Sequence, residues 1–221
     1  MLYTQNKPIE EVLESIGDEK NIFLLSCNGC AEVCETGGEE GLSAMKTELE
    51  KAGKTLTGQL NVDFLCNKVL VATRLSREMD KIEQADSILA LTCGIGVQAV
   101  SKVVNKVVHP AANTISLGGL QGLWASEERC QACGDCALDY TGGICPITFC
   151  AKSLLNGPCG GAQDGKCEVD SEKDCGWQLI YERLEKIGRL ENLKKFHKAR
   201  DHSKMFPSKD LRETSFYDIE K

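Results

Sequence analysis

The chain has 221 residues, thirteen cysteines and a formal net charge of −7. An acidic chain lacks the concentrated positive surface that nucleic-acid binding needs, so we expect no nucleic-acid partner. No apolar run approaches the ~18 residues of a membrane span, and the first residues lack the basic and then apolar pattern of a signal peptide. We therefore expect a cytoplasmic protein without a membrane span, whose thiols are reduced.

The first 122 residues alternate between helix and strand patterns, as in an α/β domain. The expected helices are 9–16, 41–52, 68–82 and 97–108. The expected strands are 21–26, 60–65, 87–92 and 114–117. This alternation predicts a mostly parallel sheet of the Rossmann or flavodoxin-like type.

Five cysteines lie where the expected strands end. Cys27, Cys66 and Cys93 each follow a strand, and Cys30 and Cys34 lie in the loop that Cys27 opens. Because the carboxyl ends of parallel strands share one edge of the sheet, we expect the five thiols to form a metal site there. They compete for about four ligand positions. The alternative is that Cys66 and Cys93 are simply buried, as free cysteines often are.

Residues 123–176 form a second, cysteine-rich region without apolar periodicity, and such a segment is not expected to fold without metal. It holds eight cysteines: Cys130, Cys133, Cys136, Cys145, Cys150, Cys159, Cys167 and Cys175. The first three form C-x-x-C-x-x-C, and Cys145 is followed by proline, as in bacterial ferredoxins. The pattern favours a ferredoxin-like domain with two [4Fe–4S] clusters over zinc, which commonly takes two separate C-x-x-C pairs. The spacing does not assign thiols to centres, and thirteen cysteines leave room for a third centre and for zinc at one site.

Residues 177–221 are expected to form an amphipathic C-terminal helix and an extended tail. Apolar side chains recur at helical spacing over 176–199, with a candidate interruption at Gly188. This helix either covers the cysteine-rich domain or docks a partner, and the sequence does not separate the two. From Ser203 the chain is mostly polar, so we expect a tail there.

The sequence contains no flavin or nicotinamide fingerprint, and none of its three histidines lies in a catalytic motif. No catalytic residue is therefore assigned. These features indicate an electron-transfer subunit that is not catalytic alone. The main alternative is a zinc-stabilised scaffold without redox change. An accessory of a zinc-dependent methyltransferase fits less well, because it needs an open coordination position.

Four stretches of the cysteine-rich region resemble the methylenetetrahydrofolate reductase C-terminal domain family. They are 145–152, which opens on Cys-Pro, 156–161 (NGPCGG), 165–168 (GKCE) and 175–177 (CGW). The stretches CNGCAEVCETGG from Cys27 and TCGIGVQ from Thr92 are similar to the N-terminal part of the same family. The resemblance thus spans most of residues 20–190.

The resemblance implies a cluster relay that passes electrons to FMN in a MetF-type flavoprotein partner. It implies that this partner reduces 5,10-methylenetetrahydrofolate to 5-methyltetrahydrofolate, a one-carbon step of the Wood–Ljungdahl pathway. The matching cysteines in both parts of the chain are then the candidate cluster ligands. The resemblance also implies an electron donor protein, such as ferredoxin or a larger redox complex.

Overall fold

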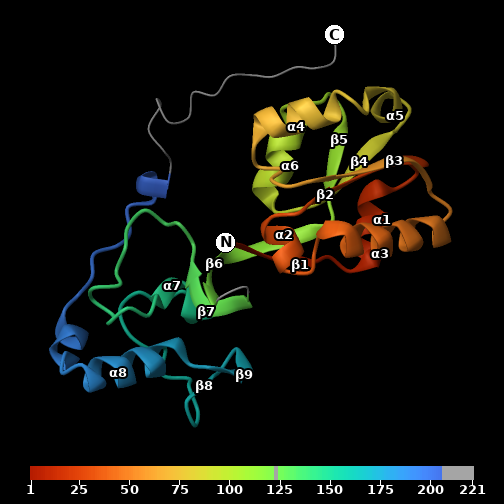
Figure 1. Cartoon of the computed structure of the whole chain (residues 1–221). Coiled ribbons are helices and arrows are strands. Elements are labelled where there is room, and N and C mark those ends of the chain that lie inside the picture. The colour runs from red at the N-terminus through yellow and green to blue at the C-terminus, as the bar shows by residue number, and fades with distance from the viewer. Residues whose placement is uncertain (122–123, 206–221) are drawn as a thin grey trace. The chain divides into compact units, whose positions relative to one another are not determined.

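The computed structural model describes the backbone of residues 1–121 and 124–205 and the side chains of 1–119 and 127–205 (Figure 1). The described residues divide into two compact units, unit 1 up to Ser126 and unit 2 from Glu127. Among them, no helix is long and apolar enough to cross a membrane. The division into three parts stays a prediction, and most of the predicted tail lies outside the described residues.

Unit 1 contains a four-stranded parallel sheet in the order β3-β2-β4-β5. Its strands are β2 (Asn21–Cys27), β3 (Thr55–Val62), β4 (Ser87–Leu91) and β5 (Val107–Pro110). The central strands β2 and β4 are mostly apolar, because both faces of such a sheet are covered. The sheet confirms the predicted α/β class, and its order is that of the first four strands of a flavodoxin-like fold.

Helices cover both faces of this sheet (Figure 1). On one face lie α1 (Ile9–Ile16) and α3 (Gly38–Lys51), and on the other lie α4 (Lys68–Leu75), α5 (Met79–Glu83) and α6 (Gly94–Ser101). Side chains of β2 alternate between the two cores: Ile22 and Leu24 face α1 and α3, whereas Phe23 and Leu25 face α4 to α6. Cys27 shares the second core, so its thiol lies on the α4 to α6 side.

A second, antiparallel pairing joins the two ends of unit 1. Strand β1 (Leu2–Asn6) pairs with β6 (Ala112–Gln121), and the Met1 amino group donates to the Gly118 carbonyl over 3.0 Å. The predicted strand 114–117 is therefore part of β6, and it does not belong to the parallel sheet. Strand β7 (Trp124–Cys130) follows and ends at the first cysteine of the cysteine-rich region.

Three other predicted elements of unit 1 differ from the structure. Strand β3 starts and ends earlier than the predicted 60–65. Polar and apolar residues alternate in this edge strand, so its apolar pattern is weak and its bounds were predicted poorly. The predicted helix 68–82 is divided into α4 and α5. The predicted helix 97–108 was wrong at both ends: α6 begins at Gly94, and the β-branched residues Val107 and Val108 open β5.

Unit 2 has little regular structure and a small core. Its elements are α7 (Pro146–Phe149), the hairpin β8 (Lys166–Cys167) and β9 (Asp170–Asp174), α8 (Gly176–Lys186) and the 3-10 helices η1 (Leu190–Lys194) and η2 (His202–Met205). Trp177, Ile180 and Leu184 of α8 are buried with Cys175. The indole Nε1 of Trp177 also donates to the Leu154 carbonyl over 2.9 Å. The apolar face of α8 thus covers the cysteine-rich segment of its own unit.

Helix α8 is shorter than the predicted 176–199. Gly188 has a φ of 67°, the left-handed conformation that ends many helices. The Arg189 N–H donates to the Leu184 carbonyl over 2.8 Å, and the Gly188 N–H donates to the Glu185 carbonyl over 3.0 Å. The helix therefore ends at the glycine that the sequence marks as an interruption.

Candidate metal centres

Four cysteines of unit 2 line one cavity, which begins where β7 ends. The cavity has a volume of about 270 Å³. Its thiols are Cys130, Cys133, Cys136 and Cys145, and we call them the first thiol set. A water molecule needs a space of only ~10–15 Å³, so this cavity admits a group of several atoms.

The other four cysteines of unit 2 line a second, much narrower cavity of about 10 Å³. These are Cys150, Cys159, Cys167 and Cys175, the second thiol set. Cys167 lies on the β8–β9 hairpin, and the Cys175 N–H ties the end of that hairpin to the Gly165 carbonyl over 2.7 Å. The structure thus divides the eight cysteines into two sets of four, a division that the spacing left open.

The short helix α7 links the two sets. Cys145, of the first set, caps its N-terminus, and Cys150, of the second, follows its last residue. A helical rise of about 1.5 Å per residue places these two Cα atoms roughly 7.5 Å apart along the axis. Pro146 occupies the first helical position, where its fixed φ favours the start of the helix. Groups held by the two sets would therefore be close neighbours.

A backbone N–H donates to a cysteine sulfur in both sets of unit 2. The Ala132 N–H donates to Cys130 Sγ over 3.3 Å, and the Gly161 N–H donates to Cys159 Sγ over 3.5 Å. In each case the donor lies two residues after the cysteine. Ala132 has a φ of 51°, which is uncommon for a residue other than glycine. Hydrogen bonds of this kind stabilise thiolate ligands and tune the potential of a cluster.

Four of the five cysteines of unit 1 gather at the carboxyl edge of the parallel sheet. Cys27 ends β2, Cys93 caps α6 after β4, and Cys30 opens the short helix α2 (Cys30–Val33). Cys66 is exposed, yet desolvation by the surrounding protein raises the pKa of its thiol. The nearby Cys27, and then Cys93 and Cys30, raise this pKa further. Cys27, Cys30 and Cys93 therefore lie close enough to Cys66 for their charges to affect its ionisation.

Cys34, the fifth cysteine of unit 1, is oriented differently. Its thiol donates to the Leu2 carbonyl of β1 over 3.7 Å. Cys27 Sγ instead lies 3.7 Å from the Asp63 carbonyl, in the loop that leads to Cys66. The structure therefore groups Cys27 with the loop of Cys66 and directs Cys34 to another strand.

All thirteen cysteines are free thiols. In the part of the chain that the structure describes, no three His, Cys, Asp or Glu side chains are arranged to hold a metal ion. A single ion requires its ligands to converge on one point, whereas a cluster is bound by thiolates spread around a core of several atoms. Metal binding by the three groups of thiols stays a prediction.

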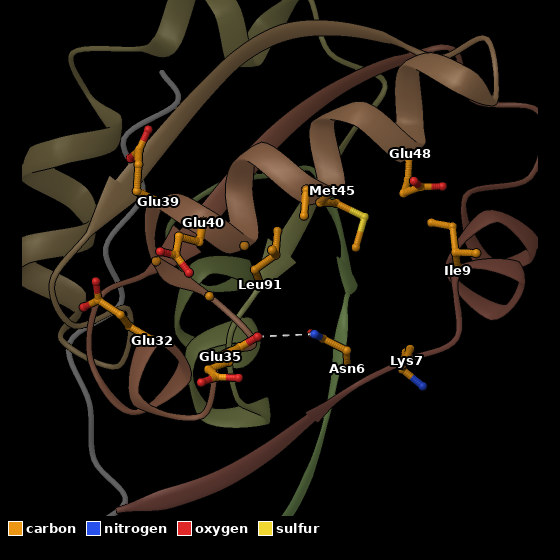
Figure 2. A pocket seen from close by; sticks show the side chains of 14 residues that line it. Asn6, Lys7, Ile9, Glu32, Glu35, Glu39, Glu40, Met45, Glu48 and Leu91 are labelled. Atoms are coloured by element: carbon orange, nitrogen blue, oxygen red, sulfur yellow. Dashed lines mark hydrogen bonds between the residues drawn. The ribbon is translucent and has the colours of Figure 1, made fainter. Parts of the chain in front are cut away.

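Unit 1 also has an acidic cavity of about 660 Å³ beside the N-terminus of α3 (Figure 2). Met45 and Leu91 give it apolar surface, and the Asn6 amide donates to the Glu35 carbonyl over 3.4 Å. Five glutamates line it: Glu32, Glu35, Glu39, Glu40 and Glu48. Lys7, which also lines the cavity, forms an ion pair with Glu11. The negative lining opposes binding of a phosphate-bearing cofactor at this place.

The fold and the thiols together define a two-unit α/β protein with a cysteine-rich second unit. Residues 109–203 match the family described as "Methylene-tetrahydrofolate reductase C terminal". This segment contains both thiol sets of unit 2, and the match supports a protein related to methylenetetrahydrofolate reductase. It does not include residues 1–108, so the resemblance of the upstream cysteine stretches stays a prediction. No curated protein and no solved structure matched the chain.

Two features of the candidate sites were absent from the sequence interpretation. One is the division of the eight cysteines by α7, which depends on tertiary contacts. The other is the N–H donor two residues after a cysteine of unit 2, at Ala132 and Gly161. A small residue at that position, as in Cys27-Asn28-Gly29, Cys130-Gln131-Ala132 and Cys159-Gly160-Gly161, is a signal that could have revealed it.

Proposed function

We propose that this chain is an electron-transfer subunit of the MetV type. In this proposal it passes electrons through iron–sulfur clusters to the FMN of a MetF-type flavoprotein in the cytoplasm. The partner then reduces 5,10-methylenetetrahydrofolate to 5-methyltetrahydrofolate. The observation that carries the proposal is the first thiol set: four cysteines, three of them in the ferredoxin-like C-x-x-C-x-x-C spacing, line one cavity inside the segment that matches the reductase family.

Each thiol set of unit 2 supplies four cysteines, the ligand number and type of a [4Fe–4S] cluster. The first thiol set would hold one and the second thiol set another, and when bound a cluster accepts and releases single electrons. The amides of Ala132 and Gly161 are placed to stabilise the negative sulfurs. Helix α7 keeps the two sets close, which favours transfer between them.

The number of electrons in the reaction assigns different steps to the two subunits. Conversion of the methylene group to a methyl group consumes a pair of electrons and a pair of protons. A donor such as ferredoxin or a larger redox complex would supply the electrons to this chain one at a time. The flavin of the partner can store the pair and deliver it to the folate, so the folate chemistry belongs to the partner.

The test is anaerobic purification followed by iron, zinc and acid-labile sulfide analysis. If both sets of unit 2 hold four-iron clusters, we expect about eight iron atoms per chain from this unit, with matching sulfide. The visible absorption should bleach on reduction and return on addition of the oxidised flavoprotein. A colourless chain with zinc and no sulfide would contradict the proposal.

The second candidate function is a zinc-stabilised scaffold of the same complex. The observation in its favour is the narrow second cavity, whose volume of about 10 Å³ suits a single atom better than a cluster. This candidate predicts zinc without sulfide and a flavoprotein whose reduction rate does not depend on the redox state of this chain. Zinc confined to the second thiol set, beside an iron–sulfur cluster in the first, would leave the electron-transfer role intact.

A further inference from the structure

We propose that unit 1 holds a further iron–sulfur cluster, bound by Cys27, Cys30, Cys66 and Cys93 at the carboxyl edge of the parallel sheet. Cys34 is not a ligand in this proposal. The inference goes beyond the proposed function, which rests on the cysteines of unit 2. It also selects four ligands from five thiols that the sequence left in competition.

The sheet topology brings the four cysteines to one place. Strands β2 and β4 are neighbours, with Ser26 paired to Leu91, so the chain leaves both strands at the same edge. The connection from β2 leads to β3 on one side of this pair, and the connection from β4 leads to β5 on the other side. In open parallel sheets, such a reversal of direction forms a crevice that binds ligands. Cys27 lies on one side of this point and Cys93 on the other.

The loops behind the site are packed too closely for larger residues. A Cβ at Gly37 would lie 2.8 Å from the Cys27 carbonyl oxygen and 3.1 Å from that of Leu91. A Cβ at Gly29 would lie 3.0 Å from both the Asp63 carbonyl oxygen and the Phe64 ring. The loops that carry Cys27, Cys30 and Cys66 are therefore held in contact by glycine.

Two helix N-termini lie next to cysteines of the site. Cys93 is the N-cap of α6, and Cys66 directly precedes Asn67, the N-cap of α4. Both helices have eight residues, and their N-terminal N–H groups carry partial positive charge. Four thiolates around a cluster carry net negative charge, so these helix ends stabilise the bound form.

The local chemistry repeats that of unit 2. The Gly29 N–H donates to Cys27 Sγ over 3.4 Å, with the donor two residues after the cysteine, as at Cys130 and Cys159. Phe64 is 55% exposed and Ile95 is 51% exposed, and they lie two residues before Cys66 and two after Cys93. Apolar side chains next to a cluster limit the access of solvent to it.

Burial alone does not explain this group of cysteines. Cys27 and Cys93 are buried, as free cysteines often are, but Cys66 is exposed. Their common position explains them better, because the loops after β2, β3 and β4 carry all four to the same edge of the parallel sheet.

The experiment compares Cys66→Ser with Cys34→Ser in the full chain, purified anaerobically. With four-iron clusters at all three sites, the unchanged chain should contain about twelve iron atoms and the Cys66→Ser variant about eight. Cys34→Ser should keep the full iron and sulfide content. Cys66 is exposed, so its replacement by serine leaves the core of unit 1 undisturbed.

Site-resolved alkylation of the unchanged chain gives a second measurement. We expect iodoacetamide to modify Cys34 and to spare the more exposed Cys66, until oxidation and chelation remove the clusters. Rapid modification of Cys66 in the native chain, or equal iron content in both variants at about eight per chain, would overturn the third cluster and leave the proposed function standing. Zinc without sulfide at this site would also overturn it. A chain without any iron would instead overturn the proposed function.

Discussion

Cys133 is the middle thiol of the C-x-x-C-x-x-C run and lines the cavity of the first thiol set. We predict that Cys133→Ala lowers the iron content by roughly four atoms per chain, because a four-iron cluster that loses a ligand is not retained. Unit 2 should also become sensitive to protease, since we propose that its folding depends on metal. Iron analysis and limited proteolysis measure the two effects.

Cys34→Ala is the matched control for that substitution. The Cys34 thiol donates to the Leu2 carbonyl, away from the other cysteines of unit 1. The control should keep both its iron and the protease resistance of unit 2. If the two variants contain the same amount of iron, the assignment of Cys133 as a ligand is wrong.

Asp86 ties the starts of neighbouring strands together in unit 1. The N–H groups of Asn21 and Lys20 each donate to its carboxylate over 2.8 Å, and these bonds hold the pKa of Asp86 below its ordinary value. A lowered pKa contributes stability above the ordinary value of about 3.9, and this contribution is lost as the pH falls through the lowered one.

We therefore predict that Asp86→Asn exchanges the amide hydrogens of β2 faster than the unchanged chain at neutral pH. The difference between the two proteins should shrink as the pH falls through the lowered pKa, because protonated aspartate resembles asparagine. Hydrogen exchange followed by NMR, with both proteins compared at each pH, measures this. A difference that does not depend on pH would show that the charge of Asp86 has no role.

At the scale of elements, α8 stabilises the cysteine-rich segment by its buried face. Ile180 is fully buried, so Ile180→Ala should cost about 2–5 kcal/mol of unfolding free energy and reduce iron retention by the second thiol set. Tyr181 is 42% exposed on the same helix, and Tyr181→Ala should change stability by less than about 0.5 kcal/mol. Chemical unfolding followed by tryptophan fluorescence tests both. Equal effects would place α8 outside the core of unit 2.

The central elements of unit 1 were predictable because their sequence patterns are strong. The apolar runs of β2 and β4 and the amphipathic pattern of α1 gave the correct elements. Edge strands were less predictable. Polar and apolar residues alternate within β3, and β5 begins with valines that also fit a helical pattern. Strand β1 was missed, since its pairing with β6 bridges over 100 residues of sequence.

The thiol sites were predictable in composition and only partly in arrangement. The predicted strand ends placed Cys27 and Cys93 correctly after β2 and β4, whereas Cys66 lies four residues beyond the end of β3. The sequence pattern did not predict that Cys34 faces β1, because that orientation depends on β1, a strand that was not predicted. Cys145 and Cys150 belong to different thiol sets because helix α7 lies between them. The sequence did not predict this helix, since four residues are too few to show a helical periodicity.

At the scale of the molecule, the two units should depend on metal to different extents. Unit 1 has two apolar cores on either side of a parallel sheet, whereas the core of unit 2 is a single small cluster around α8. We predict that removing metal makes unit 2 sensitive to protease and leaves a resistant fragment that corresponds to unit 1. Mass spectrometry of the digest identifies the fragment. Simultaneous digestion of both units would show that unit 1 also requires metal to fold.

The central claim is that this chain carries electrons to a flavin. The most direct measurement mixes the anaerobically reduced chain, freed of excess reductant, with an oxidised MetF-type flavoprotein in a stopped-flow spectrometer. The account predicts that the flavin absorption bleaches while the cluster absorption recovers, with equal numbers of electrons lost and gained. A flavin that stays oxidised beside a fully reduced chain would contradict it.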